Sequence, residues 1–226
     1  MITCPICKNS NEQLRTLESN CMFLEIEGVN QHIIRYQCDS CDVIFGSEEM
    51  IGLEKDKLMK AYLDIYSSGY RECDSSSFEF LLFTLLRPTR DGVYINWGAG
   101  TSTTSEIANT HGFTLLNYDP GLPDSLNYLT KDKISTMSID GIISNNVLDH
   151  LQDPINELSF MKSILKPGKS MIHGSDGFQY RIHWTKFHLY FFIGRSVQVM
   201  SDTIGMTHEF IPSFTTGVDI VKWNKP

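Results

Sequence analysis

Long hydrophobic runs are missing from this sequence. A membrane-spanning helix needs about 20 consecutive apolar residues, whereas the most apolar stretch, residues 78–86, is short and contains Glu79 and Thr84. The first residues turn polar almost at once, with Lys8 and Asn9 close to the start, so the sequence predicts no apolar signal-peptide core. These observations favour a cytoplasmic protein that does not enter a membrane.

Positive charge is also scarce. Lys and Arg together number 19 against 27 Asp and Glu, which gives a formal net charge of -8 at pH 7. Nucleic acids and anionic membranes attract basic surfaces, so neither is an expected partner. Internal repeats and low-complexity segments are absent. With 226 residues, 41% of them hydrophobic, the chain is long enough for one full-sized domain and a small additional one.

The chain has only six cysteines, but four of them form two matched pairs. Cys4 and Cys7 belong to one Cys-x-x-Cys turn, and Cys38 and Cys41 belong to a second. Two such turns supply the four thiolates that a tetrahedral zinc ion prefers. Two disulfides are the alternative, which a reducing cytoplasm disfavours, and iron is an alternative ion. Because four protein ligands leave no open position, we expect the zinc to be structural.

The segment between the two cysteine pairs reads as a β-hairpin. Strand-like residues 22–26 and 33–36 flank a turn, so residues 1–50 are predicted to form a zinc ribbon. This ribbon has three basic side chains against eight acidic ones, which disfavours a nucleic-acid-binding finger. The remaining cysteines, Cys21 and Cys73, are expected to be packing residues.

Two helices are predicted to follow the ribbon. Residues 53–66 place apolar side chains at helical spacing, and Ser67-Ser68-Gly69 ends this helix. A second helix is predicted over residues 76–86, ahead of Pro88. Residues 51–90 are therefore interpreted as a helical linker.

From residue 91 onward, strands and helices alternate. The predicted strands are residues 93–97, 113–118, 139–144 and 170–173, and the predicted helices are residues 105–110 and 154–165. Asp153 caps the second of these helices, and Pro154 occupies its first position. This alternation predicts an α/β fold with a doubly wound, Rossmann-like parallel sheet over residues 91–226. Such sheets bind ligands at the carboxyl ends of their strands.

The first of these strands ends in a glycine-containing turn. Gly98 and Gly100 let a ligand approach the backbone, and the helix that follows directs free N–H groups toward it. Asp119 ends the next strand, where a carboxylate can accept hydrogen bonds from both hydroxyls of a ribose. The two features together predict a nucleotide-type cofactor site.

Four segments of this region follow one another in a characteristic order. They are Tyr-Ile-Asn-Trp-Gly-Ala-Gly-Thr-Ser at residues 94–102, Asn-Tyr-Asp-Pro at 117–120, Asp-Gly-Ile-Ile-Ser-Asn-Asn-Val-Leu-Asp-His at 140–150 and Leu-Lys-Pro-Gly at 165–168. In this order and spacing they resemble the motifs of the class I S-adenosylmethionine-dependent methyltransferases, and the resemblance implies S-adenosylmethionine as the cofactor. The cofactor-binding residues that it implies are Asn96, Gly98, Gly100, Asp119, Pro120 and Asn145, with Tyr70 of the linker as a further contact.

The segments that flank these motifs narrow the resemblance. A four-cysteine ribbon and a linker with Tyr66 and Tyr70 precede them, and an aromatic, histidine-containing segment at residues 183–191 follows. The arrangement is similar to that of the zinc-ribbon C-methyltransferases of nucleotide-deoxysugar biosynthesis. This resemblance implies a small-molecule substrate, either a nucleotide-linked sugar or another natural-product intermediate.

The sequence departs from the family pattern in three places. Asn96 stands where the family has an acidic residue, and Ser102 replaces a third glycine. Residues 120–139 form a shortened region, in which we expect only a short helix over residues 124–129 and a short strand over residues 133–137. No acidic residue in this region is assigned to the adenine of the cofactor.

The candidate catalytic residues are His150 and Asp149. His150 follows the predicted strand 139–144, at the face where the transferable methyl group would lie. An imidazole titrates near neutral pH and suits a general base, and the resembling sugar enzymes use a His at this position in deprotonation. We predict that Asp149 orients His150; packing or solvation is the alternative role. His183 and His188 are expected to be structural or substrate-facing, because no acidic residue stands at ligand spacing to them.

Two other functions compete with this interpretation. An RNA methyltransferase with an N-terminal zinc finger would combine the same two parts, but the negative charge of both parts disfavours it. A non-catalytic methyltransferase fold that serves as a binding module is favoured by the shortened region 120–139. The retained Gly98, Gly100, Asp119 and His150 oppose it.

Overall fold

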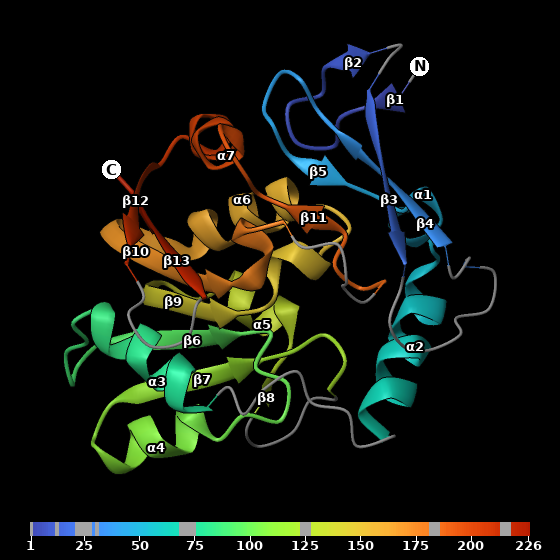
Figure 1. Cartoon of the computed structure of the whole chain (residues 1–226). Coiled ribbons are helices and arrows are strands. Elements are labelled where there is room, and N and C mark those ends of the chain that lie inside the picture. Colours follow the sequence, from blue (N-terminus) through green and yellow to red (C-terminus); the bar gives the residue numbers. More distant parts are fainter. Residues whose placement is uncertain are drawn as a thin grey trace.

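A seven-stranded sheet organises the larger part of the molecule (Figure 1). The computed structural model describes residues 2–11, 14–20, 29, 32–67, 76–122, 128–180, 186–212 and 218–226. The strands of this sheet are β6 (Val93–Trp97), β7 (Thr114–Tyr118), β8 (Tyr128–Leu129), β9 (Ile139–Asn145), β10 (Leu165–Ser175), β12 (Thr207–Ile211) and β13 (Asp219–Asn224). They lie in the order β12-β13-β10-β9-β6-β7-β8.

The sheet is parallel except at one edge. The five strands β6 to β10 pair in parallel with their neighbours among these five. In contrast, β13 runs antiparallel to both β10 and β12. The chain starts in the middle at β6, moves outward through β7 to β8, and then returns to β9 on the other side of β6. Open α/β sheets bind ligands where the strand order reverses in this way. The carboxyl end of β6, between β7 and β9, is therefore the place to look for a site.

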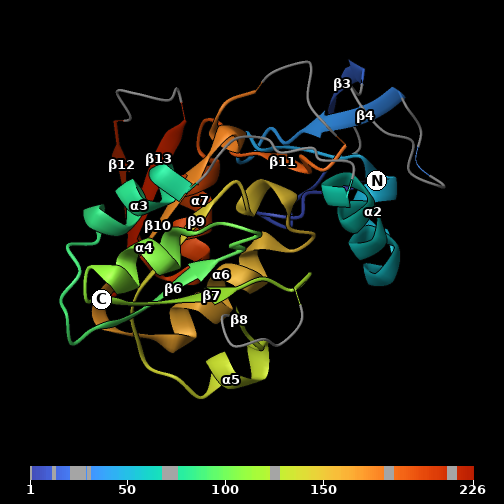
Figure 2. The same cartoon turned by 90° about the horizontal axis from the view of Figure 1, so that it is seen from below.

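Helices cover both faces of the sheet (Figure 2). One face carries α3 (Ser76–Leu85) and α4 (Thr104–Thr110), and the other carries α5 (Lys131–Ser135), α6 (Pro154–Ile164) and α7 (Ser196–Ile204). The fully buried apolar residues between α3, α4 and the sheet include Leu82, Phe83, Ala108, Leu115 and Ile143. Those between α5, α6, α7 and the other face of the sheet include Ile134, Ile142, Leu158, Met161 and Met200. The sequence prediction of a doubly wound, Rossmann-like α/β sheet is confirmed.

The N-terminal segment forms two small sheets. Strands β1 (Ile2–Thr3) and β2 (Ser10–Asn11) pair with each other, and β3 (Arg15–Asn20), β4 (His32–Gln37) and β5 (Ile44–Phe45) form an antiparallel sheet. The fourth strand of this second sheet is β11 (Tyr190–Phe191), which comes from the C-terminal part of the chain and pairs with β5. Helices α1 (Glu48–Ile51) and α2 (Lys55–Ser67) lead from β5 toward the large sheet.

Further polar contacts join the N-terminal segment to the rest of the molecule. The Gln152 side-chain amide donates to the carbonyl oxygens of Met50, Ile51 and Leu53, at 3.2, 3.1 and 2.7 Å. The Arg195 guanidinium donates to both carboxylate oxygens of Asp42, at 2.9 and 3.1 Å. Apolar side chains of both parts also share one buried cluster. The division at residues 50 and 90 stays a prediction, and the sheet that contains β11 crosses it.

Most predicted elements are confirmed. The strand predicted at 93–97 is β6, and the helix predicted at 76–86 is α3. Asp153 caps α6 as expected, because its carboxylate accepts a hydrogen bond from the backbone N–H of Asn156 at 3.1 Å. The strand predicted at 22–26 lies outside the described residues. None of the described helices is long and apolar enough to span a membrane.

The prediction for the shortened region was wrong in the order of its elements. Residues 128–129 form the strand β8, which pairs with β7, and the helix α5 follows it instead of preceding it. A local hydrogen bond starts α5, whereas a tertiary contact forms β8. The Thr130 side chain accepts a hydrogen bond from the N–H of Lys133 and so starts α5. The edge of β7 offers unpaired backbone groups that β8 satisfies.

The cap of α6 generates a first prediction. Replacing Asp153 with Ala leaves the N–H of Asn156 without its side-chain partner. The free energy of unfolding should fall by about 0.5–2 kcal/mol. Urea denaturation followed by circular dichroism measures this, with Asn156→Ala as the control, because that substitution keeps the capping bond. A variant Asp153→Ala as stable as the control would show that the cap contributes nothing.

Candidate functional site

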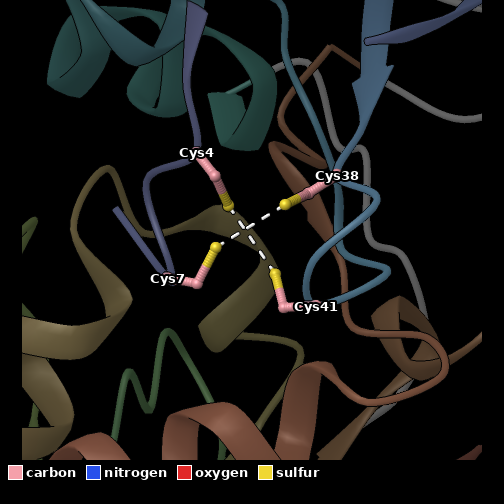
Figure 3. Close-up of side chains that lie close together, drawn as sticks. All are labelled: Cys4, Cys7, Cys38 and Cys41. Carbon is pink, nitrogen blue, oxygen red and sulfur yellow. Dashed lines mark hydrogen bonds between the residues drawn. The ribbon is translucent and has the colours of Figure 1, made fainter. Parts of the chain in front are cut away.

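Four cysteine thiols converge at the start of the N-terminal segment (Figure 3). The sulfur atoms of Cys4 and Cys41 are 3.7 Å apart, and those of Cys7 and Cys38 are 3.6 Å apart. A disulfide would bring two sulfurs to about 2.05 Å. Four sulfurs at tetrahedral corners, each about 2.3 Å from a zinc ion, would instead be about 3.8 Å apart. The thiols therefore fit a closed tetrahedral metal site and not two disulfides.

The two cysteine turns have the same backbone conformation. In each turn the residue after the second cysteine has a positive φ, 59° at Lys8 and 65° at Asp42. The N–H of that residue donates to the carbonyl of the first cysteine, at 3.0 Å in one turn and 2.8 Å in the other. The hydrogen bond from Cys41 lowers the pKa of Cys4 to about 5 against the opposing effect of burial. One thiolate of the four is thus already favoured by the fold.

The loop between β6 and α4 contains the two predicted glycines, and both have positive φ values, 68° at Gly98 and 50° at Gly100. A Cβ atom on Gly98 would lie 2.4 Å from a methyl group of Val147, so this glycine allows two loops to pack closely. A Cβ atom on Gly100 would meet nothing within 4 Å. Gly100 is therefore the position where the backbone faces open space and a ligand can approach it.

Asp119 lies beside this loop, at the end of β7. Its Oδ2 atom accepts a hydrogen bond from the N–H of Gly100 at 2.9 Å, and its Oδ1 atom accepts one from Gly121 at 2.8 Å. Burial raises the pKa of this carboxyl, although both N–H groups oppose the rise. Each carboxylate oxygen retains a second lone pair. Pro120, the next residue, is exposed.

Asn96 is the penultimate residue of β6, and Asn145 ends the neighbouring strand β9. Both side chains are buried, and within the described ranges neither Oδ1 atom has a hydrogen-bond partner. The Asn96 Nδ2 group donates to the Oε2 atom of Glu79 at 2.6 Å. Sequence reasoning missed Glu79, which it treated only as an interruption of an apolar run. The available signal was a carboxylate in a helix that is otherwise apolar around it.

The predicted catalytic residues lie in the turn η1 (Leu148–His150), directly after β9. The Nε2 atom of His150 is 3.4 Å from Oδ2 of Asp149, and the Nε2 atom of His188 is 3.3 Å from the same oxygen. The other oxygen of Asp149 accepts a hydrogen bond from the Ser175 hydroxyl at 2.7 Å. Asp149 and His188 are buried, and His150 is the most exposed of the three. The structure thus brings the side chains of Asp149, His150 and His188 together, and the orienting role of Asp149 stays a prediction.

Burial and the neighbouring groups shift the pKa values of Asp149 and His188. Burial alone would raise the pKa of Asp149, but the two histidines and the Ser175 hydroxyl hold it below its ordinary value. Burial, helped by His150, lowers the pKa of His188 to about 3. At neutral pH Asp149 is therefore a carboxylate and His188 a neutral imidazole.

His188 has an acidic neighbour that the sequence does not reveal. The sequence offers it no acidic neighbour at ligand spacing, whereas the fold places Asp149 at 3.3 Å. The contact arises because β11 returns to the N-terminal sheet, and the N–H of Leu189 donates to the carbonyl of Asp149 at 2.7 Å. The predicted cofactor contact Tyr70 and the residue His183 lie outside the described residues.

Helix α2 stands next to the carboxyl ends of β6 and β7 in both views (Figures 1 and 2). At one end of this edge, a Cβ atom on Gly121 would lie 3.0 Å from the sulfur of Met59. At the other end, the ring of Tyr62 is 6.3 Å from the ring of His150 and 4.4 Å from that of Phe187. One face of α2 therefore reaches from the Asp119 loop to the Asp149–His150–His188 cluster.

Comparison with known proteins identifies the class of protein that this fold and site define. The profile of the methyltransferase domain family matches residues 70–202, more than half of the chain, so the chain belongs to this family. The structure of 1,6-didemethyltoxoflavin N1-methyltransferase from Burkholderia thailandensis, with bound 1,6-didemethyltoxoflavin and S-adenosylhomocysteine, is similar at a TM-score of 0.57 and 14% identity, covering 85% of this chain and 95% of that one. Magnesium protoporphyrin IX methyltransferase from Synechocystis, with bound S-adenosylmethionine, is similar at 0.50 and 10% identity, covering 80% and 99%. No curated protein sequence matches the chain.

The thiol geometry generates a second prediction. Protein purified without added metal should contain about one zinc ion per chain, and Cys38→Ser should lose it, because three thiolates no longer complete the tetrahedron. The N-terminal segment should then unfold at a lower temperature, since metal binding energy is folding energy in so small a unit. Elemental analysis and calorimetry measure both effects. Cys73→Ser is the control, and a zinc-free wild-type protein contradicts the assignment.

Proposed function

We propose that this protein is an S-adenosylmethionine-dependent methyltransferase that methylates a small molecule and holds one structural zinc ion. The observation that supports it best is the joint geometry of the glycine loop and Asp119. Gly100 faces open space, and its N–H is bound to a carboxylate that retains acceptor capacity. This combination suits a ligand with a ribose and an extended chain, as S-adenosylmethionine has.

The residues present fit that cofactor. Asp119 would accept hydrogen bonds from the two ribose hydroxyls, with Pro120 beside them. Gly100 would let the ligand pass close to the backbone, and Gly98 would let this loop pack against Val147. The buried carbonyl oxygens of Asn96 and Asn145, which have no partner among the described residues, are suited to accept N–H groups of the ligand. Tyr70 remains a proposed contact from the resemblance alone.

In this proposal His150 takes a proton from the acceptor. When bound, S-adenosylmethionine supplies an electrophilic methyl group on a sulfonium sulfur. The Nε2 atom of His150 lies 3.4 Å from Oδ2 of Asp149. The carboxylate of Asp149 stabilises the imidazolium that results, and Ser175 keeps that carboxylate in place. Because His188 is neutral, it adds no competing positive charge.

The acceptor is proposed to be a nucleotide-linked sugar or another natural-product intermediate. The partly exposed ring of Tyr62 lies next to His150 and packs on the buried ring of Phe187, and such a ring can pack against a ring-shaped substrate. The net charge of -8 disfavours an RNA substrate. The shortened region, which favoured a non-catalytic role, still supplies an edge strand. Its Tyr128 hydroxyl donates to the carbonyl of Gly100 at 2.6 Å.

The role of Asp119 generates a third prediction. In Asp119→Asn, either orientation of the amide turns its NH2 group toward a backbone N–H, of Gly100 or of Gly121. Affinity for S-adenosylhomocysteine should fall about ten- to a hundredfold, which is the scale of a lost charge-assisted pair. Isothermal titration calorimetry measures the dissociation constant. Asp132→Asn, on an exposed residue of α5, is the matched control.

The same residue sets an expected pH dependence. Burial raises the pKa of Asp119, so its carboxylate is protonated at a higher pH than an ordinary Asp, whose pKa is about 3.9. Wild-type affinity for S-adenosylhomocysteine should therefore decline on acidification with a midpoint above that value, and Asp119→Asn should not follow this decline. Equal affinities of wild type and Asp119→Asn at neutral pH would place the ribose elsewhere.

The role of His150 generates a fourth prediction. A positioned base contributes a factor of about 10²–10⁴ to the rate. Methyl transfer from labelled S-adenosylmethionine to a panel of small-molecule acceptors should fall by this factor in His150→Ala, while affinity for S-adenosylhomocysteine stays nearly unchanged. Asp149→Asn should reduce transfer less, because Asp149 supports the base without taking the proton itself. His111→Ala, on an exposed histidine, is the control.

Two outcomes would contradict the role of His150. A folded His150→Ala protein with full turnover would leave positioning of the acceptor as the source of catalysis. Asp149, His150 and His188 also offer three metal-ligand atoms within 4.8 Å of one another. A metal content of about two ions per wild-type chain and about one per His150→Ala chain would assign these residues to a second ion instead.

A further inference from the structure

Glu79 is a buried carboxylate at the centre of the candidate site. It lies in the first turn of α3, with 3% of its surface exposed. Its Oε2 atom accepts three hydrogen bonds, from Asn96 Nδ2 at 2.6 Å, from the Ser102 hydroxyl at 2.6 Å and from the Thr104 hydroxyl at 2.9 Å. These donors come from the end of β6, the glycine loop and the start of α4. Glu79 therefore connects the end of β6, the glycine loop and the start of α4.

Among the described residues, no cation is paired with the negative charge of Glu79. All three donors are uncharged, and none of the ion pairs among the described residues includes Glu79. Asp140, near the amino end of β9, shows how a carboxylate is usually compensated by cations. Lys166 lies 2.6 Å from it, and Lys169 lies 3.4 Å from it. A buried carboxylate without such a partner costs free energy unless a ligand compensates it.

Two further acceptor atoms point to the same conclusion. The second carboxylate oxygen of Glu79, Oε1, receives none of the three hydrogen bonds. The Oδ1 atom of Asn96, a side chain that is 1% exposed, has no partner in the part of the chain that the structure describes. The Glu79–Asn96 pair thus combines one negative charge with two oxygen atoms that accept no hydrogen bond from the described residues.

The place of the pair in the sheet indicates which part of a ligand it would meet. Asp119 ends β7 and His150 follows β9, and β6 lies between these two strands. A cofactor with its ribose on Asp119 and its methyl group directed toward His150 must cross the end of β6. The remaining end of S-adenosylmethionine is an amino acid with a primary ammonium group, which is both a cation and a triple hydrogen-bond donor.

We propose that Glu79 and Asn96 form the subsite for the ammonium group at the amino-acid end of the cofactor. This inference rests on the proposed function and extends it to a residue that the motifs do not contain. Glu79 supplies the charge from helix α3, and Asn96 supplies a carbonyl oxygen from the end of β6. Ser102 and Thr104 hold the Glu79 carboxylate in position by their hydroxyl groups.

Two ligands separate this role from a purely structural one. S-adenosylhomocysteine carries the adenosine and the amino-acid end, whereas 5′-methylthioadenosine carries the adenosine alone. Titration calorimetry with both ligands should show that Glu79→Gln weakens S-adenosylhomocysteine about ten- to a hundredfold and changes 5′-methylthioadenosine less than about threefold. Asp140→Asn is the matched control, since it removes a partly buried carboxylate near the amino end of β9 and should leave both affinities unchanged.

A double variant tests whether the charge itself is what the ligand requires. Glu79→Gln combined with Asn96→Asp exchanges the carboxylate and the amide within the pair, so one acid and one amide remain at the end of β6. This variant should recover most of the S-adenosylhomocysteine affinity that Glu79→Gln loses. It also keeps the proposal testable if Glu79→Gln alone fails to fold, because the exchanged pair should then bind S-adenosylhomocysteine nearly as well as wild type.

Three outcomes would overturn the subsite. They are Glu79→Gln protein that binds S-adenosylhomocysteine like wild type, an equal loss of affinity for both ligands, and a folded double variant that recovers nothing. An equal loss would make Glu79 a structural support of the loop. Wild-type protein that binds neither ligand would instead refute the proposed function, and the two failures are therefore distinguishable.

Discussion

Backbone pairing between β5 and β11 is the interaction on which the relative position of the four thiols and the Asp149–His150–His188 cluster depends. β5 follows the second cysteine turn, and β11 follows His188 closely. Leu189 bridges the two regions, since its carbonyl accepts the N–H of Gly46 at 3.1 Å and its own N–H donates to Asp149 at 2.7 Å. A metal that stabilises the N-terminal turns therefore also supports the residues that hold Asp149. We therefore propose that the ribbon supports the site structurally, and its negative charge disfavours a nucleic-acid-binding role.

Buried carboxylates are the second common element of the site. Glu79, Asp119 and Asp149 all lie toward the carboxyl edge of the sheet, and each is held by hydroxyl, amide or imidazole groups, with no Lys or Arg paired to it in the described part of the chain. A carboxylate deprived of water must be compensated by donors or by a cation. The edge is therefore prepared for a positively charged ligand, and S-adenosylmethionine carries both a sulfonium and an ammonium group. Asp140, at the other edge, has its lysines and needs no ligand.

Sequence predictions were correct where the forces that form an element act between residues close together in the chain. The strand at 93–97 and the cap at Asp153 were predicted correctly, because apolar pattern, flanking glycine and capping chemistry are all encoded within a few residues. The elements of the shortened region were placed in the wrong order. A two-residue strand has no periodicity of its own, and β8 exists because β7 has an edge to be paired. His188 was likewise interpreted without its acidic neighbour, because that neighbour is distant in the chain.

The sequence by itself determined the chemistry of each local motif: the four thiols, the glycine loop with Asp119, and the adjacent Asp149 and His150. In each, spacing over a few residues sets which atoms can act together. Only the tertiary structure decided that Glu79 lies against Asn96, that His188 shares an oxygen of Asp149, and that β11 completes the N-terminal sheet. The physical reason is that these contacts join segments far apart in the chain. Their energies come from burial and desolvation, which exist only once the sheet and its helices have assembled.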